Sequence, residues 1–338
     1  MSKKVDEQVK FDREIQRIKE KLSNSEKKYK KLLKTVELVE RERDADMCIQ
    51  EAKSSFTIEP KHSSRTSEAT AVLVASDWHV EEIVKKEAVN GLNEYSLAIA
   101  KKRGTAFFSH GSRITHIMRK DIKITKIVLA LLGDFITNDI HDEMPENNQL
   151  APIEAITFAQ EIIRSGIKFL LKEHPGVEIE CVCHSGNHAR TTPKCHSQLE
   201  HGYSLEYGMY NNLANEFEDK KNVKFIIPHS YHSYADIYGL TVRFHHGHAI
   251  RYWGGVGGIT IPVNKAIKQW NDSKHADLDV FGHFHQYLDG GRFVANGSMI
   301  GYNAYAVRVK ASYERPQQAF FLIDKKRGKT VSAPILFI

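Results

Sequence analysis

Short apolar runs alternate with longer amphipathic stretches between about residue 70 and residue 275 of the chain. The short runs are rich in β-branched residues, as buried strands are, whereas the longer stretches have the spacing of helices. Predicted strands cover 71–76, 127–132, 177–183, 240–244 and 278–281, and predicted helices cover about 93–119, 152–172, 199–219 and 261–273. After residue 285 only short strand-like runs remain. This order predicts a protein of the α/β class.

The N-terminal segment has a different pattern, with apolar residues in alternating steps of four and three, the heptad spacing of a coiled coil. The seam positions are Phe11, Ile15, Ile18, Leu22, Ser25, Tyr29, Leu32, Val36 and Val39. We expect a coiled-coil helix over residues 1–46 that joins copies into a homo-oligomer. The alternative is a single amphipathic helix folded back on its own domain. The periodicity then disappears, which predicts a linker at 47–68 and a second domain at 69–338.

Composition limits the possible classes of protein. With 338 residues, 41% of them hydrophobic, the chain can bury one large core and carry an appendage. No apolar run is long enough to span a membrane and the N-terminus has no signal-peptide pattern, so we expect no membrane partner and a cytoplasmic protein. Residues 1–43 hold 14 of the 48 basic and 9 of the 42 acidic residues, so most of the +6 net charge lies in the arm. The near-neutral charge of the remaining 295 residues argues against attraction of nucleic acid by the whole domain. Local patches of basic residues stay an alternative.

The four cysteines do not predict a disulfide framework. Cys181 and Cys183 share one face of a predicted strand and are interpreted as core residues, while Cys48 and Cys195 stand apart in polar surroundings. A reducing compartment fits this usage.

Polar residues with metal-binding side chains come directly after the predicted strands. The five strings are Asp77-Trp78-His79, Gly133-Asp134, Gly186-Asn187-His188, His246-Gly247 and Gly282-His283-Phe284-His285. Any one string is more often a turn or a satisfied polar group, particularly in a chain with 18 histidines. Five strand ends that all carry Asp, Asn or His predict a shared site.

Such a set of ligands suits two divalent cations. Two cations roughly 3.5–4 Å apart can activate a water and stabilise both oxygens of an in-line displacement at phosphorus. A carboxylate between the cations offsets their repulsion. Because the strings contain imidazole and oxygen ligands but no cysteine, we expect two manganese ions first, with iron or zinc as alternatives.

The order of these strings resembles the calcineurin-like metallophosphoesterase superfamily over about residues 70–300. The resemblance implies a two-sheet β-sandwich flanked by helices. It also implies that the first metal is held by Asp77, His79, Asp134 and His285, and the second by Asp134, Asn187, His246 and His283. His188 is by resemblance a catalytic residue that protonates the leaving oxygen, a role that suits histidine.

Two positions depart from the pattern of that superfamily. Ala189 stands where many members have an acidic residue, and Thr137 stands where an Asp or His commonly orients the catalytic imidazole. Asn138, Asp139 and His141 are the candidates to replace it.

Residues that could bind substrate come after the third and fourth strings. Arg190 and Arg251 could hold a phosphate oxygen, although each could equally pair with a carboxylate. The glycines of the segment after Arg251, among them Gly255 and Gly257, could offer backbone N–H groups to phosphate or form only a mobile loop. Tyr252 and Trp253 beside them could stack on a base.

A softer resemblance, carried by residues 281–286, Asn296-Gly297-Ser298 and the glycine segment, is to phage-encoded DNA exonuclease-like phosphoesterases. We therefore predict a phosphodiesterase that attacks phosphorus with a metal-bound hydroxide, acting on DNA or another nucleotide diester, in the host cytoplasm if phage-encoded. A phosphomonoesterase is the alternative. A non-catalytic scaffold is the third hypothesis, but the retromer subunit, a scaffold of this superfamily, lacks the third-string histidine that is present here as His188.

Overall fold

The computed structural model describes residues 2–51, 67–140, 144–252, 254 and 257–337 of the chain. It divides into two compact units, residues 1–62 and 63–338. Most of the linker predicted at 47–68 lies outside the described residues. None of the described helices is both long and apolar enough to cross a membrane.

The first unit is the helix α1 (Ser2–Glu51). The predicted helix is present, but it runs five residues beyond the predicted end at residue 46. The seam pattern fades there, yet Met47, Gln50 and Glu51 are good helix formers, so loss of the heptads does not end the helix. Side chains of residues 4–48 are exposed, seam positions included.

The second unit is built on a six-stranded sheet in the order β11-β10-β1-β2-β3-β4. Its strands are β1 (Glu68–Ala75), β2 (Lys123–Leu131), β3 (Glu178–Cys183), β4 (Val223–Ile226), β10 (Gln317–Asp324) and β11 (Gly328–Leu336). Strands β1 to β4 pair in parallel, while β10 is antiparallel to β1. The parallel strands therefore end at one edge of the sheet, where the loops after them meet.

A second, five-stranded sheet has the order β5-β6-β7-β9-β8. Its strands are β5 (Ser233–Ile237), β6 (Leu240–Phe244), β7 (Leu278–Phe281), β8 (Leu288–Asp289) and β9 (Phe293–Ala295). Strands β6 and β7 run in parallel, so the residues after them also lie at one end of the sheet.

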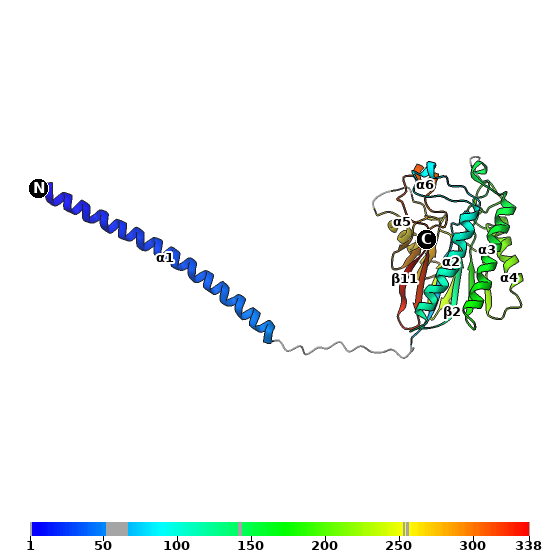
Figure 1. Ribbon diagram of the computed structural model, residues 1–338, viewed down its shortest axis with the longest axis horizontal. Coiled ribbons are helices and arrows are strands. Elements are labelled where there is room, and N and C mark those ends of the chain that lie inside the picture. The colour runs from blue at the N-terminus through cyan, green and yellow to red at the C-terminus, as the bar shows by residue number, and fades with distance from the viewer. Residues whose placement is uncertain (1, 52–66, 141–143, 253, 255–256, 338) are drawn as a thin grey trace. The chain divides into compact units, whose positions relative to one another are not determined.

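Side chains along β1 point alternately to the two faces of the sheet, which explains how the layers stack. Ala71, Leu73 and Ala75 pack in the core beneath α2 (Leu97–Met118), α3 (Pro152–Glu173) and α4 (Leu205–Glu216). Val72 and Val74 point the other way, into the core shared with the second sheet. The outer face of that sheet is covered by α5 (Thr260–Asn271), and Figure 1 shows α5 and the α2–α4 layer on opposite sides. The predicted two-sheet architecture with flanking helices is confirmed.

Most differences from the predicted elements are at ends and in short pieces. The third helix of the domain begins at Leu205 rather than near Leu199, because a short 3-10 turn, His201–Tyr203, precedes it. Strands β4 and β5 and the short helix α6 (Ala304–Arg308) were not predicted. Each is only four or five residues long, and such segments carry little periodicity.

Candidate metal centre

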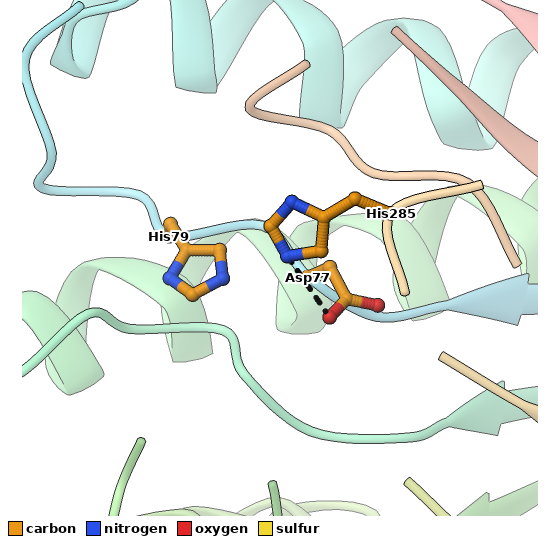
Figure 2. A group of neighbouring side chains, drawn as sticks. All are labelled: Asp77, His79 and His285. Carbon is orange, nitrogen blue, oxygen red and sulfur yellow. Dashed lines mark ion pairs between the residues drawn. The ribbon is translucent and has the colours of Figure 1, made fainter. Parts of the chain in front are cut away.

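The strand-end side chains converge in the structure. Potential ligand atoms lie within 4.8 Å of one another in three overlapping groups, which share His79 and Asp134. The groups are Asp77, His79 and His285; His79, Asp134 and His188; and Asp134, His246 and His283. Figure 2 shows the first group, in which His285 Nε2 lies 3.4 Å from Asp77 Oδ1. Segments more than 200 residues apart in the sequence thus form one cluster.

Three glycines of the strings let the backbone segments approach this closely. A Cβ on Gly133 would lie 2.0 Å from the Gly186 nitrogen, and one on Gly186 would lie 2.1 Å from Asp134 Oδ1. A Cβ on Gly282 would lie 2.3 Å from Asp77 Oδ2. The glycines are required because any side chain there would collide with a proposed metal ligand or with the backbone beside it.

The backbone at the proposed ligands adopts the left-handed conformation that non-glycine residues rarely adopt. Asp77, His79, Asp134, His283 and His285 all have φ between 47° and 71°. Each such residue costs about 1–3 kcal/mol and persists only where its surroundings hold it. Main-chain hydrogen bonds between the first two strings hold this backbone conformation at Asp77 and Asp134. Trp78 N donates to Asp134 O at 2.8 Å, and Asp77 N donates to Gly133 O at 3.0 Å.

Hydrogen bonds orient two imidazoles so that their Nε2 atoms face the cluster. His246 Nδ1 pairs with the Leu132 carbonyl at 2.7 Å, and His79 Nδ1 pairs with Thr137 Oγ1 at 3.0 Å. His79 Nε2 and Asn187 Oδ1 are buried and have no hydrogen-bond partner among the described residues. His246 Nε2 is also buried and lies 2.9 Å from the Asp134 carboxylate. Because buried polar atoms are nearly always paired, unpaired ligand atoms beside a carboxylate and an imidazole fit the binding of cations.

Burial and neighbouring charges shift the pKa values of the clustered groups. Burial would raise the pKa of Asp134, but His246, His188 and His79 hold that pKa well below its ordinary value. Burial would lower the pKa of His246, but the Asp134 carboxylate 2.9 Å away raises it to about 10. Burial lowers the pKa of His79 and of His283, which keeps both imidazoles in the neutral, ligand-forming state. A cation at Asp134 would take the place of the His246 proton.

Among the described residues, the main chain of Thr137 orients His188. Its Nδ1 pairs with the Thr137 carbonyl at 2.9 Å, and its Nε2 lies 4.0 Å from Asp134 Oδ2. The Asn138 amide instead donates to the carbonyls of His188 and Arg190. His141 lies outside the described residues. Thr137 therefore serves through its backbone, which explains how an acidic residue at this position can be absent.

Two buried glutamates that support the centre were missed by the sequence analysis. Glu81 Oε1 accepts from the N–H groups of Thr137 and Asn138 at 2.7 and 2.8 Å. The Glu206 carboxylate accepts from Phe135 N and from Gly186 N, each at 2.7 Å, and so joins the second string to the third. Burial raises the pKa of Glu81 to about 7 and that of Glu206 to about 8. The sequence signal was limited to an acidic residue directly after an apolar one, as in Val80-Glu81 and Leu205-Glu206.

Gln318 is a third support that was missed. Its Oε1 accepts from Ser76 N at 3.0 Å and from Trp78 Nε1 at 3.1 Å, and its Nε2 donates to the Gly297 carbonyl at 2.6 Å. The available signal in the sequence was a glutamine directly before the apolar run of β10, and the structure buries that glutamine fully. It therefore links the Ser76 backbone and the Trp78 indole, on either side of Asp77, to the Gly297 carbonyl.

The predicted substrate-binding residues have varied surroundings. Arg190 donates to the carbonyls of Asn187, Thr192 and Pro193, which stabilises its own loop. Arg251 is exposed, Gly257 has φ +89° just before α5, and Gly255 lies outside the described residues. Their role in substrate binding stays a prediction.

Comparison with known proteins identifies weak structural likenesses only. No family model matches the chain, and no curated protein does. A hypothetical protein from Pyrococcus horikoshii OT3 is 14% identical, with a TM-score of 0.39 over 80% of this chain and 89% of that one. A predicted phosphoesterase from Streptococcus pneumoniae TIGR4 is 12% identical, with a TM-score of 0.30 over 79% and 97%. Vps29 from Entamoeba histolytica, complexed with zinc, is 12% identical, with a TM-score of 0.30 over 78% and 99%. The functional conclusion therefore depends on the site itself.

Proposed function

We propose that this protein is a metallophosphoesterase of the calcineurin-like type that uses two divalent cations to hydrolyse phosphate diesters. The observation that carries the proposal is the set of unpaired, buried ligand atoms around Asp134. Two cations roughly 3.5–4 Å apart would activate a water and neutralise charge on the phosphate. We expect manganese, with iron or zinc as alternatives, because imidazole and carboxylate ligands suit all three.

The seven proposed ligands divide into two sets that share one carboxylate. Asp77, His79, Asp134 and His285 would hold the first cation, and Asp134, Asn187, His246 and His283 the second. Two of the clustered groups support this division. They are Asp77 with His79 and His285, and Asp134 with His246 and His283. Asp134 is assigned to both sets because its carboxylate also lies in one group with His79.

His188 is the proposed proton donor to the leaving oxygen. Its Nδ1 is engaged with the Thr137 carbonyl, which leaves Nε2 directed to the same space as the ligands. General acid catalysis of this kind contributes roughly 10²–10⁴-fold to a rate. We expect His188→Ala to lose turnover by about that factor while its bound metal, measured by mass spectrometry, stays at the wild-type content. Unchanged turnover would remove His188 from the mechanism.

DNA or another nucleotide diester is the proposed substrate. Exposed Arg251 and Tyr252, just after the fourth string, could contact a phosphate and stack on a base. The test compares manganese-dependent hydrolysis of a bis-aryl phosphate, an aryl monophosphate and single-stranded DNA, with Asp134→Asn as the inactive control. Preference for the monoester with intact DNA would favour a phosphomonoesterase, and no metal-dependent hydrolysis of any of them would favour a scaffold.

The arm α1 is the proposed site of homo-oligomerisation. Seam side chains such as Ile18 and Leu32 are 60% and 61% exposed, and pairing with a second copy would bury them. Leu32→Lys should therefore lower the mass measured by light scattering. Leu38→Lys is a matched control, because Leu38 is 59% exposed but lies off the seam. Equal masses for both variants and the wild type would contradict the coiled coil.

A further inference from the structure

A second cluster of metal-ligating side chains lies outside the seven proposed ligands. One ligand atom each from Cys195, Glu200 and His248 lies within 4.8 Å of the other two. Cys195 and Glu200 come from the loop after the third string, and His248 comes directly after the fourth string. Three different donor atoms are thus brought together by two loops.

This cluster has the same feature that marks the main centre, namely buried ligand atoms without hydrogen bonds. Glu200 Oε1 lies 2.9 Å from His248 Nε2, yet Oε1 and His248 Nδ1 are both buried and lack a hydrogen-bond partner in the described part of the chain. In the main centre, His79 Nε2 and Asn187 Oδ1 are likewise buried without a hydrogen-bond partner among the described residues. Buried ligand atoms without a hydrogen bond are expected where a cation binds.

We propose that Cys195, Glu200 and His248 bind a third cation, and that this cation is zinc. Thiolate, carboxylate and imidazole are the three side-chain ligand types of zinc sites, and thiolate disfavours magnesium and manganese. Because zinc coordinates the thiolate, binding releases the Cys195 proton to solvent. Three protein ligands leave the fourth position open for a water or a substrate oxygen, as in catalytic zinc sites.

The position of His248 places this third site beside the main centre. Its ring centroid lies 5.6 Å from that of His246 and 6.4 Å from that of His283, two proposed ligands of the second cation. Binding of the ion itself does not depend on whether the protein is a phosphoesterase.

Cobalt(II) provides a direct test because only a sulfur ligand gives a thiolate-to-cobalt charge-transfer band in the near ultraviolet. None of the seven ligands of the main centre contains sulfur, so cobalt bound there does not give this band. We expect cobalt-loaded full-length protein to show the band and Cys195→Ser to lose it, together with one of three bound metal equivalents. Cys48→Ser is the matched control, since Cys48 is also exposed, and it should keep both band and stoichiometry. No band in the wild type, or a band that persists in Cys195→Ser, would overturn the proposal.

A second measurement uses the wild-type protein and so does not depend on a variant that folds. Iodoacetamide should alkylate Cys195 in the presence of a chelator, and zinc should protect it, while Cys48 reacts equally in both conditions. Peptide mass spectrometry reads both sites in one experiment. Equal labelling of Cys195 with and without zinc would contradict the site. Loss of hydrolytic activity in other assays would affect the proposed function but neither of these readouts.

Discussion

Gly186→Ala tests whether the packing of the third string against Asp134 holds the metal centre. The new Cβ would lie 2.1 Å from Asp134 Oδ1 and 2.3 Å from the Asp134 nitrogen. Ordinary contacts begin at 3.4 Å, so the carboxylate must retreat by roughly 1.3 Å. The contact with the Asp134 nitrogen also requires the backbone of one of the two segments to move, by roughly 1.1 Å. Both movements displace the one ligand proposed to be shared by both cations.

The expected losses are large enough to measure. Overpacking of this kind costs about 1–3 kcal/mol in unfolding free energy. A misplacement of about 1 Å at a catalytic centre can cost roughly 100-fold in rate, so turnover should fall at least that far. Urea unfolding, metal content by mass spectrometry and hydrolysis of a bis-aryl phosphate measure the three effects in one preparation.

Gly208→Ala is the matched control. Gly208 lies in α4, and an added Cβ would meet no atom within 4 Å. A helix-interior alanine should stabilise the protein by up to about 1 kcal/mol and leave turnover unchanged. If Gly186→Ala retained wild-type metal content and turnover, the proposed dependence of the centre on the close approach of Gly186 to Asp134 would be refuted.

Two further predictions concern residues that the sequence analysis did not single out. Glu81→Ala should lower turnover without loss of metal. Glu81 accepts a hydrogen bond from Thr137 N, and the Thr137 carbonyl orients His188, so loss of the carboxylate would loosen this turn. Glu81→Gln keeps an acceptor oxygen and should restore most of the rate in the same assay. His174 is buried against Ser112, and burial, followed by His116 and Arg119, lowers its pKa from 6.5 to about 4. A depressed pKa stabilises the fold above pH 6.5, and that stability is lost as the pH falls towards 4, so the melting temperature of His174→Gln should fall less than that of the wild type over this window. An equal fall in melting temperature for His174→Gln and the wild type between pH 6.5 and pH 4 would contradict the lowered pKa of His174.

The convergence of the strand ends could be anticipated because it depends on local pattern. Apolar runs such as 127–132 mark buried strands, and the residues after parallel strands meet at one edge of the sheet. The position of Asp134 directly after such a run therefore carried information about the site. The same reasoning covers His246 and His283, which come just after β6 and β7.

The supports of the site could not be anticipated, because they depend on contacts between distant segments. Glu206 joins Phe135 to Gly186, and the separation of 71 positions between Phe135 and Glu206 contains no signal that pairs them. Thr137 was considered by its side chain, although its carbonyl orients His188. Cys195 was interpreted as isolated because His248 lies far along the chain and meets it only in the folded loops.

The most direct measurement of the central claim is anomalous diffraction from crystals of the protein grown with manganese. Two anomalous peaks are predicted roughly 3.5–4 Å apart on either side of the Asp134 carboxylate, one beside Asp77 and His285 and the other beside His246 and His283. A single peak away from Asp134, or no peak in crystals grown at saturating manganese, would contradict the shared centre.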